Sequence, residues 1–356
     1  MTGQAADRDA DPGTESRLRF LMSRAAHGAD PAAAQLIETH MSWVVNAGER
    51  VLKLKKPVRY PFLDFSTPQL RERNCREELR LNRRLAPQVY LGLLALQWHE
   101  GHFALLPEDR LPAPGTTIDW LVLMRRLPAE RMLDRVIATG ALRPEDIDAV
   151  IALLARFYRE AAPTTLGADA YLARMRREQA INRALLVQPR FAGLQAGPVL
   201  DRLDAAIDAQ AATLRERVLG HHVVDGHGDL RPEHVCLNRP PVIIDCLEFS
   251  AELRQVDPFD ELTYLGLECA VAGASWVAQR VVDGVAAELG ERPPDSLLHL
   301  YTANRAALRA RLAVAHLLDP QPRTPDRWLP LGRRYLAHAA SALDALDTLD
   351  RAGHEP

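Results

Sequence analysis

Two aspartates near the middle of the chain are placed where they could do chemistry together. Asp229 lies in the polar stretch HGDLRPEH, residues 227–234, and Asp245 ends the apolar stretch PVIID that follows it. One loop and one hairpin separate them, a spacing that lets both carboxylates face one cleft. A carboxylate in a cleft can accept a proton from a hydroxyl group or bind a metal ion. A lone HGD sequence is often no more than a turn, so a catalytic site is indicated only if further charged groups accompany it.

A cationic strand earlier in the chain supplies one of these groups. In the stretch RVLKLKKP, the alternation of a β-strand places Lys53 and Lys55 on the same face. Phosphoryl transfer needs a cation near the phosphates, carboxylates that hold metal and a base beside the acceptor hydroxyl. We expect Glu77 or Glu78, on the helix that follows, to fix the phosphate lysine. The alternative is that the lysines form the solvated edge of a sheet.

The elements that must position these groups fall into two parts. A chain of 356 residues is too long for one small core and predicts two lobes. Residues 17–127 are expected to form a small antiparallel sheet of five strands, with one main helix inserted after the third strand and capped by Ser66 or Thr67. Residues 128–356 are expected to form a larger, mostly helical lobe, and residues 1–16 a disordered tail. The predicted fold class is therefore α+β.

Composition and charge exclude several classes of protein. The net charge of −3 gives no case for nucleic-acid binding, and no apolar stretch is long enough to span a membrane. The N-terminus does not resemble a secretory signal, so a cytoplasmic protein is expected. None of the four cysteines lies in a C-x-x-C pair, which favours buried reduced thiols over a zinc site or disulfides. The sequence does not define an oligomeric state.

These stretches together resemble the aminoglycoside phosphotransferase and choline kinase-like superfamily, which has a protein-kinase-like bilobal fold. The resemblance runs from residue 36 to residue 311 and is greatest to an uncharacterised bacterial phosphotransferase-like branch, some members of which carry a fused P-loop kinase domain. No G-x-x-x-x-G-K-[ST] motif follows here, so the stand-alone form is expected. The segments that carry the resemblance are ETHMSWVV, LKLKKPVRYPFLDFST, CREELRLNRRLAP, HGDLRPEH, IIDCLEF and LRQVDPFDEL.

The resemblance implies an ATP- or GTP-dependent phosphotransferase that uses Mg²⁺ and acts on a hydroxyl group of a small molecule. Asp229 would be the catalytic base, with His227 bracing its loop, and Asp245 would be the principal metal ligand. Lys53, or its rival Lys55, would contact the nucleotide phosphates. The implied supporting residues are Glu77 as partner of the lysine, Met124, Arg125 and Arg126 as the hinge that meets adenine, and Asp257 and Asp260 as braces of the catalytic loop.

The sequence departs from the superfamily pattern at two places. The nucleotide-covering hairpin has THMSW instead of G-x-G-x-x-G, so phosphate contacts would come from backbone N–H groups and the hydroxyls of Thr39 or Ser42. The metal-binding asparagine, five residues after Asp229, is replaced by His234, and imidazole suits Mn²⁺ or Zn²⁺ better than Mg²⁺. Either Asp245 and Glu248 hold the metal, or His234 tunes the metal preference towards Mn²⁺, or catalysis is impaired.

Two other functions compete with the kinase. The first is a metal-dependent hydrolase, whose transition metal would be held by histidines and aspartates of the segment 222–234. The second is a pseudokinase that binds a nucleotide or ligand without turnover. The residues that the hydrolase would use are His222, Asp225, His227, Asp229 and His234.

The acceptor is expected to be neutral or anionic rather than an aminoglycoside. Arg305 and Arg309 lie one helical turn apart on one face of a predicted helix. Arginine forks suit phosphate or carboxylate groups, so these two residues are candidate acceptor ligands. The alternative is a solvated helix face whose arginines cover the core.

Overall fold

The structure is a computed structural model that describes residues 12–27, 34–60 and 63–352. The chain divides into two compact units, which are described separately. Unit 1 comprises residues 1–129 and 242–250, and unit 2 comprises residues 130–241 and 251–356. The segment 242–250 therefore joins Asp245 to unit 1, whereas the sequence placed it in the C-terminal lobe.

Unit 1 is built on an antiparallel sheet of six strands, one more than expected, in the order β1-β2-β3-β8-β6-β7. These strands are β1 (Gln35–Glu38), β2 (Ser42–Ala47), β3 (Arg50–Lys55), β6 (Tyr90–His99), β7 (His102–Pro107) and β8 (Thr116–Arg125). The remaining elements are the helices α1 (Gly13–Leu21), α2 (Arg24–His27) and α3 (Pro68–Asn82), the hairpin β4 (Arg59–Tyr60) and β5 (Leu63–Asp64), the 3₁₀ turn Glu108–Arg110 and the short β11 (Val242–Ile243).

The expected disordered tail, residues 1–16, overlaps the first helix of the structure. Residues 1–11 of the expected disordered tail lie outside the described residues, and α1 already begins at Gly13. Arg17 on α1 is buried and forms an ion pair with Asp119 of β8 at 2.7 Å. Asp119 also accepts two hydrogen bonds from Arg71 of α3, at 2.7 and 2.9 Å. One buried carboxylate therefore attaches both helices to the sheet.

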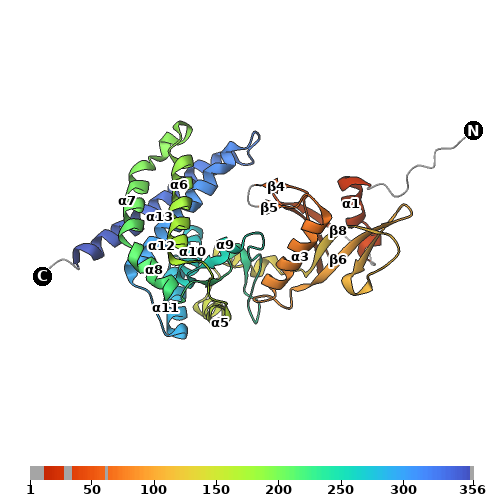
Figure 1. Cartoon of the computed structure of the whole chain (residues 1–356), viewed down its shortest axis with the longest axis horizontal. Coiled ribbons are helices and arrows are strands. Elements are labelled where there is room, and N and C mark those ends of the chain that lie inside the picture. Colours follow the sequence, from red (N-terminus) through yellow and green to blue (C-terminus); the bar gives the residue numbers. More distant parts are fainter. Residues whose placement is uncertain (1–11, 28–33, 61–62, 353–356) are drawn as a thin grey trace, which may run out of the picture. The chain divides into compact units, whose positions relative to one another are not determined.

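Helix α3 lies along the sheet beside β6 and β8 (Figure 1). Thr67 caps its N-terminus by accepting a hydrogen bond from the N–H of Leu70, and Pro68 is the first helical residue, where its missing N–H costs nothing. The buried face of α3 is unusual because it is largely polar. Arg71, Cys75, Glu78 and Asn82 are spaced four, three and four residues apart along it, and Leu81 is the remaining buried residue of the helix.

Unit 2 is mainly helical. Its helices are α4 (Leu133–Ala138), α5 (Pro144–Glu160), α6 (Ala168–Leu186), α7 (Gly197–Ala209), α8 (Ala211–Leu219), α9 (Ala251–Arg254), α10 (Pro258–Ala272), α11 (Trp276–Leu289), α12 (Asp295–Ala315) and α13 (Pro325–Ala352). Its short strands are β9 (Val224–Asp225), β10 (Val235–Cys236) and β12 (Gln255–Val256), and its 3₁₀ turns are Ala129–Arg131 (which begins at the last residue of unit 1), Pro189–Leu194, Pro232–His234 and His316–Leu318.

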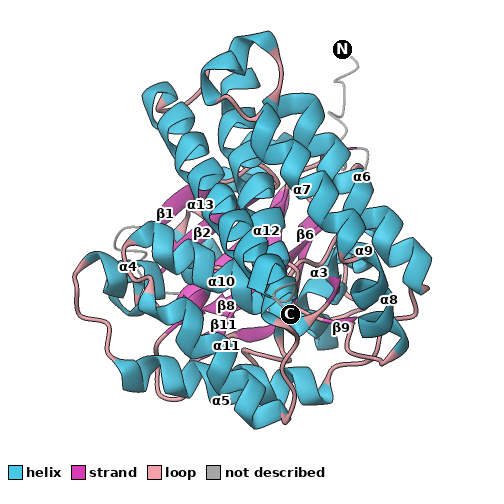
Figure 2. Cartoon of the chain, turned by 90° about the vertical axis from the view of Figure 1, so that its left-hand side faces the viewer, coloured by secondary structure: helices cyan, strands magenta, loops and turns pink. Residues whose placement is uncertain are grey.

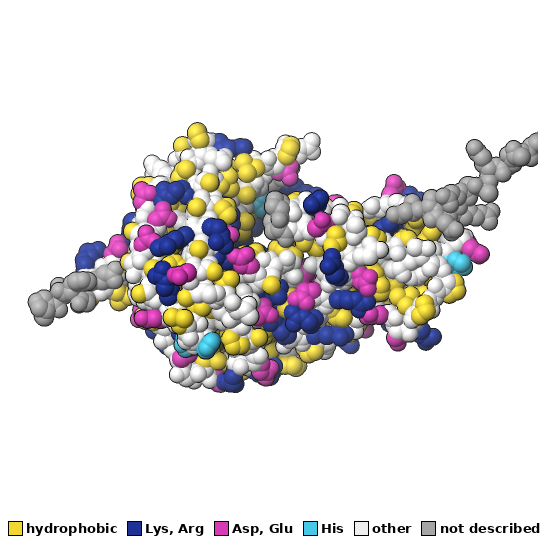
Figure 3. All heavy atoms as spheres, viewed as in Figure 1, with side chains coloured by type: hydrophobic (Ala, Val, Ile, Leu, Met, Phe, Trp, Pro, Cys, Tyr) yellow, Lys and Arg dark blue, Asp and Glu magenta, His cyan; other side chains and the backbone are white. Residues whose placement is uncertain are grey.

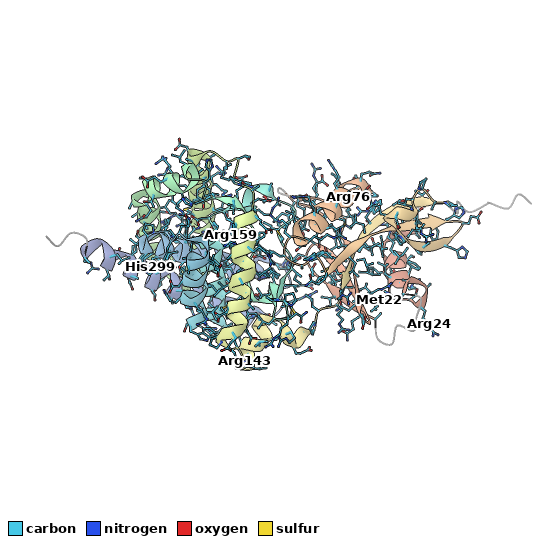
Figure 4. All side chains as sticks on the ribbon, turned by 90° about the horizontal axis from the view of Figure 1, so that it is seen from below. Met22, Arg24, Arg76, Arg143, Arg159 and His299 are labelled. Carbon is cyan, nitrogen blue, oxygen red and sulfur yellow. The ribbon has the colours of Figure 1, made fainter. Side chains whose placement is uncertain are left out.

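Helix α10 is the central helix of this unit. It packs against α11 and α12, and α12 packs in turn against α6 and along α13 (Figure 2). Every residue of α10 from Pro258 to Cys269 is buried, including three carboxylates. Helix α5 is instead amphipathic and packs against α11, with Arg143 and Arg159 at its two ends (Figure 4). The small sheet unit and the larger helical unit confirm the predicted α+β class.

The cysteines, the helices and the surface charges test what composition predicted. All four cysteines are reduced and buried, as expected, and burial raises the pKa of the Cys75 thiol to about 12. In the described part of the chain, no helix combines the length and apolarity needed to cross a membrane. Basic and acidic side chains are interspersed on the face that Figure 3 shows.

Candidate functional site

Unit 1 contains one candidate site, a group of charged residues here called the lysine cluster: Lys53, Lys55, Glu78, Asp245 and Glu248. Glu78 binds both lysines, with Nζ–Oε distances of 2.8 Å to Lys53 and 2.6 Å to Lys55. Lys53 also binds Asp245 at 2.9 Å, and Lys55 binds Glu248 at 2.7 Å. The predicted strand alternation is therefore correct, because both lysines face the same carboxylate of α3.

The predicted lysine partner Glu77 is wrong by one residue. Glu78 lies on the buried stripe of α3 and is 0% exposed, whereas Glu77 binds Arg80 on the outer side of the helix at 2.6 Å. The reason is helical geometry, since adjacent residues point about 100° apart. Arg76, labelled in Figure 4, is on the outer side too, where it binds Glu72.

The charges of the cluster stabilise one another. Burial alone would lower the pKa of Lys53, but Asp245 and Glu78 raise it well above its ordinary value. Burial alone would likewise raise the pKa of Glu78, but the two lysines lower it. Lys53, Lys55 and Glu78 are therefore ionised near neutral pH, and the side chains of three acidic residues face two ammonium groups.

The two lysines differ in access to solvent. The side chain of Lys55 is 1% exposed and its ammonium group lies 5.0 Å from the centre of the Phe65 ring. The side chain of Lys53 is 16% exposed, and that of its partner Asp245 is 47% exposed. Lys55 is thus enclosed by its partners, whereas Lys53 and Asp245 form the accessible side of the cluster.

Asp245 is held in place by its backbone. Its φ of +63° lies in the left-handed region, which aspartate tolerates better than most residues. Its N–H donates to the hydroxyl oxygen of the fully buried Tyr90 at 3.2 Å. The next N–H, of Cys246, donates to Asn82 of α3 at 2.9 Å. The backbone at Asp245 is consequently held from both β6 and α3.

Three other predictions for unit 1 are corrected by the structure. Glu248, expected as a metal ligand, is the counter-charge of the enclosed Lys55, and its side chain is 10% exposed. The hydroxyl of Thr39, expected at the phosphates, closes the turn between β1 and β2, donating to the backbone oxygen of Ser42 and accepting from its N–H. Ser42 itself is buried at 3% exposure.

The expected hinge Met124–Arg126 is the third. The N–H of Arg125 donates to the oxygen of Val89 at 2.8 Å, and that of Arg126 donates to the oxygen of Glu49 at 2.7 Å. Both N–H groups are used within unit 1, so neither is a donor for adenine, and a contact through the backbone oxygens of residues 124–126 stays a prediction. Met124 is paired within the sheet, opposite Val51 and Tyr90.

Unit 2 contains a second candidate site, residues 227–234, here called the HGD loop. The antiparallel pair β9–β12 places this loop beside the start of α10. Glu261 of α10 is buried and accepts hydrogen bonds from the N–H groups of His227, at 3.0 Å, and Gly228. Gly228 has a φ of +89°, a conformation that favours glycine. Glu261 therefore holds the turn that presents Asp229.

The predicted braces of this loop are corrected accordingly. Asp257 caps α10 and binds Arg217 at 2.6 Å, and Asp260 binds Arg305. Glu261, not predicted, is the brace. His227 does contribute as expected, since it is fully buried and its Nδ1 accepts the N–H of Asp229 at 3.3 Å.

The carboxylate of Asp229 is surrounded by donors. Its Oδ1 accepts the hydroxyl of Tyr264 at 3.2 Å and lies 3.0 Å from Nε of Arg231. Burial alone would raise the pKa of Asp229, but His234, Arg231 and His227 lower it below its ordinary value. Asp229 is therefore ionised at neutral pH, as a base requires, and its side chain is 29% exposed.

His234 does not have the geometry of a metal ligand. Its Nδ1 lies 2.8 Å from the backbone oxygen of Asp229, so Nδ1 carries the proton and donates it. Its Nε2 lies 3.3 Å from a guanidinium nitrogen of Arg231. A metal ion at Nε2 would lie against the guanidinium of Arg231, so the predicted role of His234 as a metal ligand is wrong. His234 closes the HGD loop instead.

The histidine and aspartate cluster of the hydrolase alternative is not assembled. His222 pairs with Glu291, and Asp225 accepts from Arg254 at 2.8 Å. Within residues 12–27, 34–60 and 63–352, no group of three or more His, Cys, Asp or Glu side chains is arranged to hold a metal ion.

The two candidate acceptor arginines are also occupied. Arg305 is buried and grips Asp260 with two hydrogen bonds, at 2.8 and 2.7 Å. Arg309 grips Glu268 in the same way, at 2.9 and 3.1 Å. The predicted shared helix face is correct, but the forks bind carboxylates of α10, so the prediction that they bind an acceptor is wrong.

Sequence reasoning passed over three residues that shape these sites: Arg231, Glu261 and Tyr264. Glu261 and Tyr264 carried a signal, because residues 257, 261, 264 and 268 share one face of a helix and all four are polar. Glu78 was expected only as the alternative to Glu77. Positions 71, 75, 78 and 82 of α3 share a face in the same way, and three of the four residues are polar, so apolar spacing alone did not favour Glu78 over Glu77.

Comparison with known proteins identifies the fold. No family model matches the chain. Uncharacterised proteins of Mycobacterium tuberculosis and Mycobacterium bovis are 31% identical over 318 residues, which cover 86% of this chain but only 60% of those proteins. The chain thus spans less than two thirds of the length of these relatives.

Solved structures with a similar fold include a choline/ethanolamine kinase family protein, a choline kinase and a spectinomycin phosphotransferase. A choline/ethanolamine kinase family protein from Mesorhizobium loti is 16% identical, with a TM-score of 0.52 over 93% of this chain and 98% of that one. Choline kinase from Cryptosporidium parvum is 8% identical, with a TM-score of 0.53 over 95% and 97%. The AMP-bound spectinomycin phosphotransferase is 12% identical, with a TM-score of 0.54 over 92% and 98%.

Replacing Glu78 should destabilise unit 1. In Glu78→Gln, two buried lysines lose a shared counter-charge, and we expect a loss of about 3–5 kcal/mol in the free energy of unfolding. Glu77→Gln is the matched control, because it changes an exposed pair worth less than about 1 kcal/mol. Urea unfolding followed by tryptophan fluorescence measures both, and equal losses in the two variants would contradict the assignment of Glu78.

The same carboxylate should make stability depend on pH. The folded pKa of Glu78 is lowered, so its contribution is present above the unfolded value of about 4.3 and is lost as the pH falls through the folded pKa. We expect the unfolding free energy of the wild type to fall more steeply below about pH 4.3 than that of Glu78→Gln. Urea unfolding at several pH values measures this difference. If the unfolding free energies of the wild type and of Glu78→Gln fell in parallel with pH, the lowered pKa of Glu78 would be contradicted.

Proposed function

We propose that the chain is an ATP- or GTP-dependent phosphotransferase that acts on a hydroxyl group of a small molecule. Its fold is similar to that of choline kinases and of spectinomycin phosphotransferase, and the residues placed on that fold support this function. The observation that carries the proposal is the accessible pair of Lys53 and Asp245, held by a buried Glu78. This pair has the cation and the carboxylate that a triphosphate and its metal need.

Lys53 is the proposed phosphate ligand, in preference to Lys55. A phosphate group that reached Lys55 would have to displace two carboxylates in a nearly water-free place. Lys53 has one accessible partner, Asp245, whose side chain is half exposed. The nucleotide phosphates would take the place of Asp245 at the ammonium group, and the carboxylate of Asp245 would then be able to hold the metal.

Asp245 is the proposed ligand of Mg²⁺. This ion is bound in kinase sites by one or two carboxylates together with substrate phosphates and water, so one accessible, ionised carboxylate fits it. When bound, the metal would neutralise charge on the phosphates. Metal binding by Asp245 needs neither Glu248 nor His234. Because His234 was the reason to expect Mn²⁺, no described residue now favours Mn²⁺ over Mg²⁺.

Asp229 is the proposed base. It takes the proton of the acceptor hydroxyl while the hydroxyl oxygen forms a bond to the terminal phosphorus, and the bond from that phosphorus to the nucleoside diphosphate breaks. Asp229 is ionised at neutral pH, which supports this role.

The acceptor is proposed to be neutral rather than polycationic. Arg305 and Arg309 gave the original reason for an anionic acceptor, and their charges are neutralised by Asp260 and Glu268. Arg231, by contrast, is paired with the base itself, with 3.0 Å between its Nε and Oδ1 of Asp229. A cationic acceptor would be repelled at the reacting hydroxyl, which argues against an aminoglycoside.

Replacing Asp229 should remove turnover and leave nucleotide binding intact. A general base contributes about 10²–10⁴-fold, so we expect Asp229→Asn to lose at least about 100-fold in ADP formation from ATP, Mg²⁺ and a panel of neutral hydroxyl compounds. Its melting temperature should still rise with MgATP as much as that of the wild type.

The control for this experiment is Asp225→Asn, which changes an aspartate of the same segment that is bound to Arg254. Equal losses in both variants would place the effect in folding rather than in catalysis. If the wild type binds ATP but forms no ADP with any compound, the nucleotide-binding module without turnover replaces the kinase.

A further inference from the structure

Tyr264 is a buried tyrosine that makes direct contact with the proposed base. It lies on α10, its side chain is almost entirely buried, and its hydroxyl donates to Oδ1 of Asp229 at 3.2 Å. A buried phenol needs a hydrogen-bond partner, but that partner could have been a backbone oxygen. Here it is the carboxylate that the proposed reaction depends on.

The position of Tyr264 on α10 follows that of the loop brace. Glu261 and Tyr264 are three residues apart, so they point to the same side of the helix. Glu261 holds the backbone of the HGD loop through the N–H groups of His227 and Gly228, and Tyr264 reaches the side chain of Asp229. One helix therefore sets both the course of the loop and the orientation of its carboxylate.

The two oxygens of Asp229 have different surroundings. Oδ1 accepts from Tyr264 and lies 3.0 Å from Nε of Arg231. Oδ2 lies 3.9 Å from Nδ1 of His234, beyond hydrogen-bond distance, and that Nδ1 is hydrogen-bonded to the backbone oxygen of Asp229. Oδ2 is thus the more basic oxygen, because the nearest donor, Nδ1 of His234, donates its proton to the backbone oxygen of Asp229 and not to Oδ2.

We propose that Tyr264 is a positioning residue: with Arg231 it holds Oδ1 of Asp229, so that Oδ2 takes the proton of the acceptor hydroxyl. This inference rests on the proposed function. The proton passes from the acceptor oxygen to Oδ2, the electron pair it leaves forms the new bond to phosphorus, and the leaving nucleoside diphosphate takes the electrons of the broken bond.

The phenol stays a neutral donor in the working range of pH. Burial, followed by the charge of Asp229, raises the pKa of Tyr264 well above its ordinary value. The charged and titratable groups around this pair are His227, Arg231 and His234 of the loop, Arg309 of α12 and Glu268 of α10. Removing the hydroxyl takes one donor from the carboxylate and leaves the other groups in place, so the pKa of Asp229 should rise.

The test is Tyr264→Phe, with Tyr301→Phe as matched control. Tyr301 is also fully buried, and its hydroxyl donates to a different carboxylate of the same region, Asp257, at 3.1 Å. The carboxyl carbon of Asp229 is followed by NMR against pH in protein labelled with ¹³C-aspartate, and Asp229→Asn identifies its signal. We expect the pKa of Asp229 to rise by about one unit in Tyr264→Phe and to stay unchanged in Tyr301→Phe.

Turnover gives the second readout. We expect kcat for ATP consumption to fall about tenfold in Tyr264→Phe with the KM for ATP unchanged, as for loss of an interaction made in the transition state. An unchanged pKa of Asp229, or equal effects in both variants at equal melting temperature, would overturn the inference. A shifted pKa in a protein without any Asp229-dependent turnover would confirm the contact, but would overturn the proposed function and the catalytic role of Tyr264 with it.

Discussion

Glu78 shares its two oxygens between two lysines, and unit 1 is organised around this contact. Two ammonium groups on neighbouring inward positions of β3 would be too costly to bury without counter-charges. Glu78 supplies one from α3, and Asp245 and Glu248 supply two more from the segment 242–250. Because the lysines need these carboxylates, a segment more than a hundred residues further along the chain is part of the N-terminal unit.

Unit 2 follows the same rule along α10. The buried face of this helix carries Asp257, Glu261, Tyr264 and Glu268, and each has a partner: Arg217, the backbone of the HGD loop, Asp229 and Arg309. Buried polar groups of this kind are costly unless fully paired, and fully paired they allow one arrangement. The fixed orientation of Asp229 is therefore a consequence of how α10 is buried.

The sequence predicted the pairs of elements better than the residues that join them. Strand alternation correctly put Lys53 and Lys55 on one face, and the motif order correctly brought Asp245 to the lysines. The roles of Glu77, His234 and the two arginines were misjudged for one reason. Whether a polar side chain meets a ligand or another part of the fold depends on tertiary contacts, and residues adjacent in sequence differ in burial as Glu77 and Glu78 do.

The central claim is that Lys53 and Asp245 receive a nucleotide triphosphate and its metal, and calorimetric titration of ATP with and without Mg²⁺ tests it most directly. The account predicts that Mg²⁺ strengthens ATP binding to the wild type about tenfold or more, equivalent to about 1.4 kcal/mol, and that Asp245→Asn abolishes this gain. It also predicts that Lys53→Met weakens ATP binding in both conditions. Binding that is the same in the wild type and both variants, or no binding at all, would contradict it.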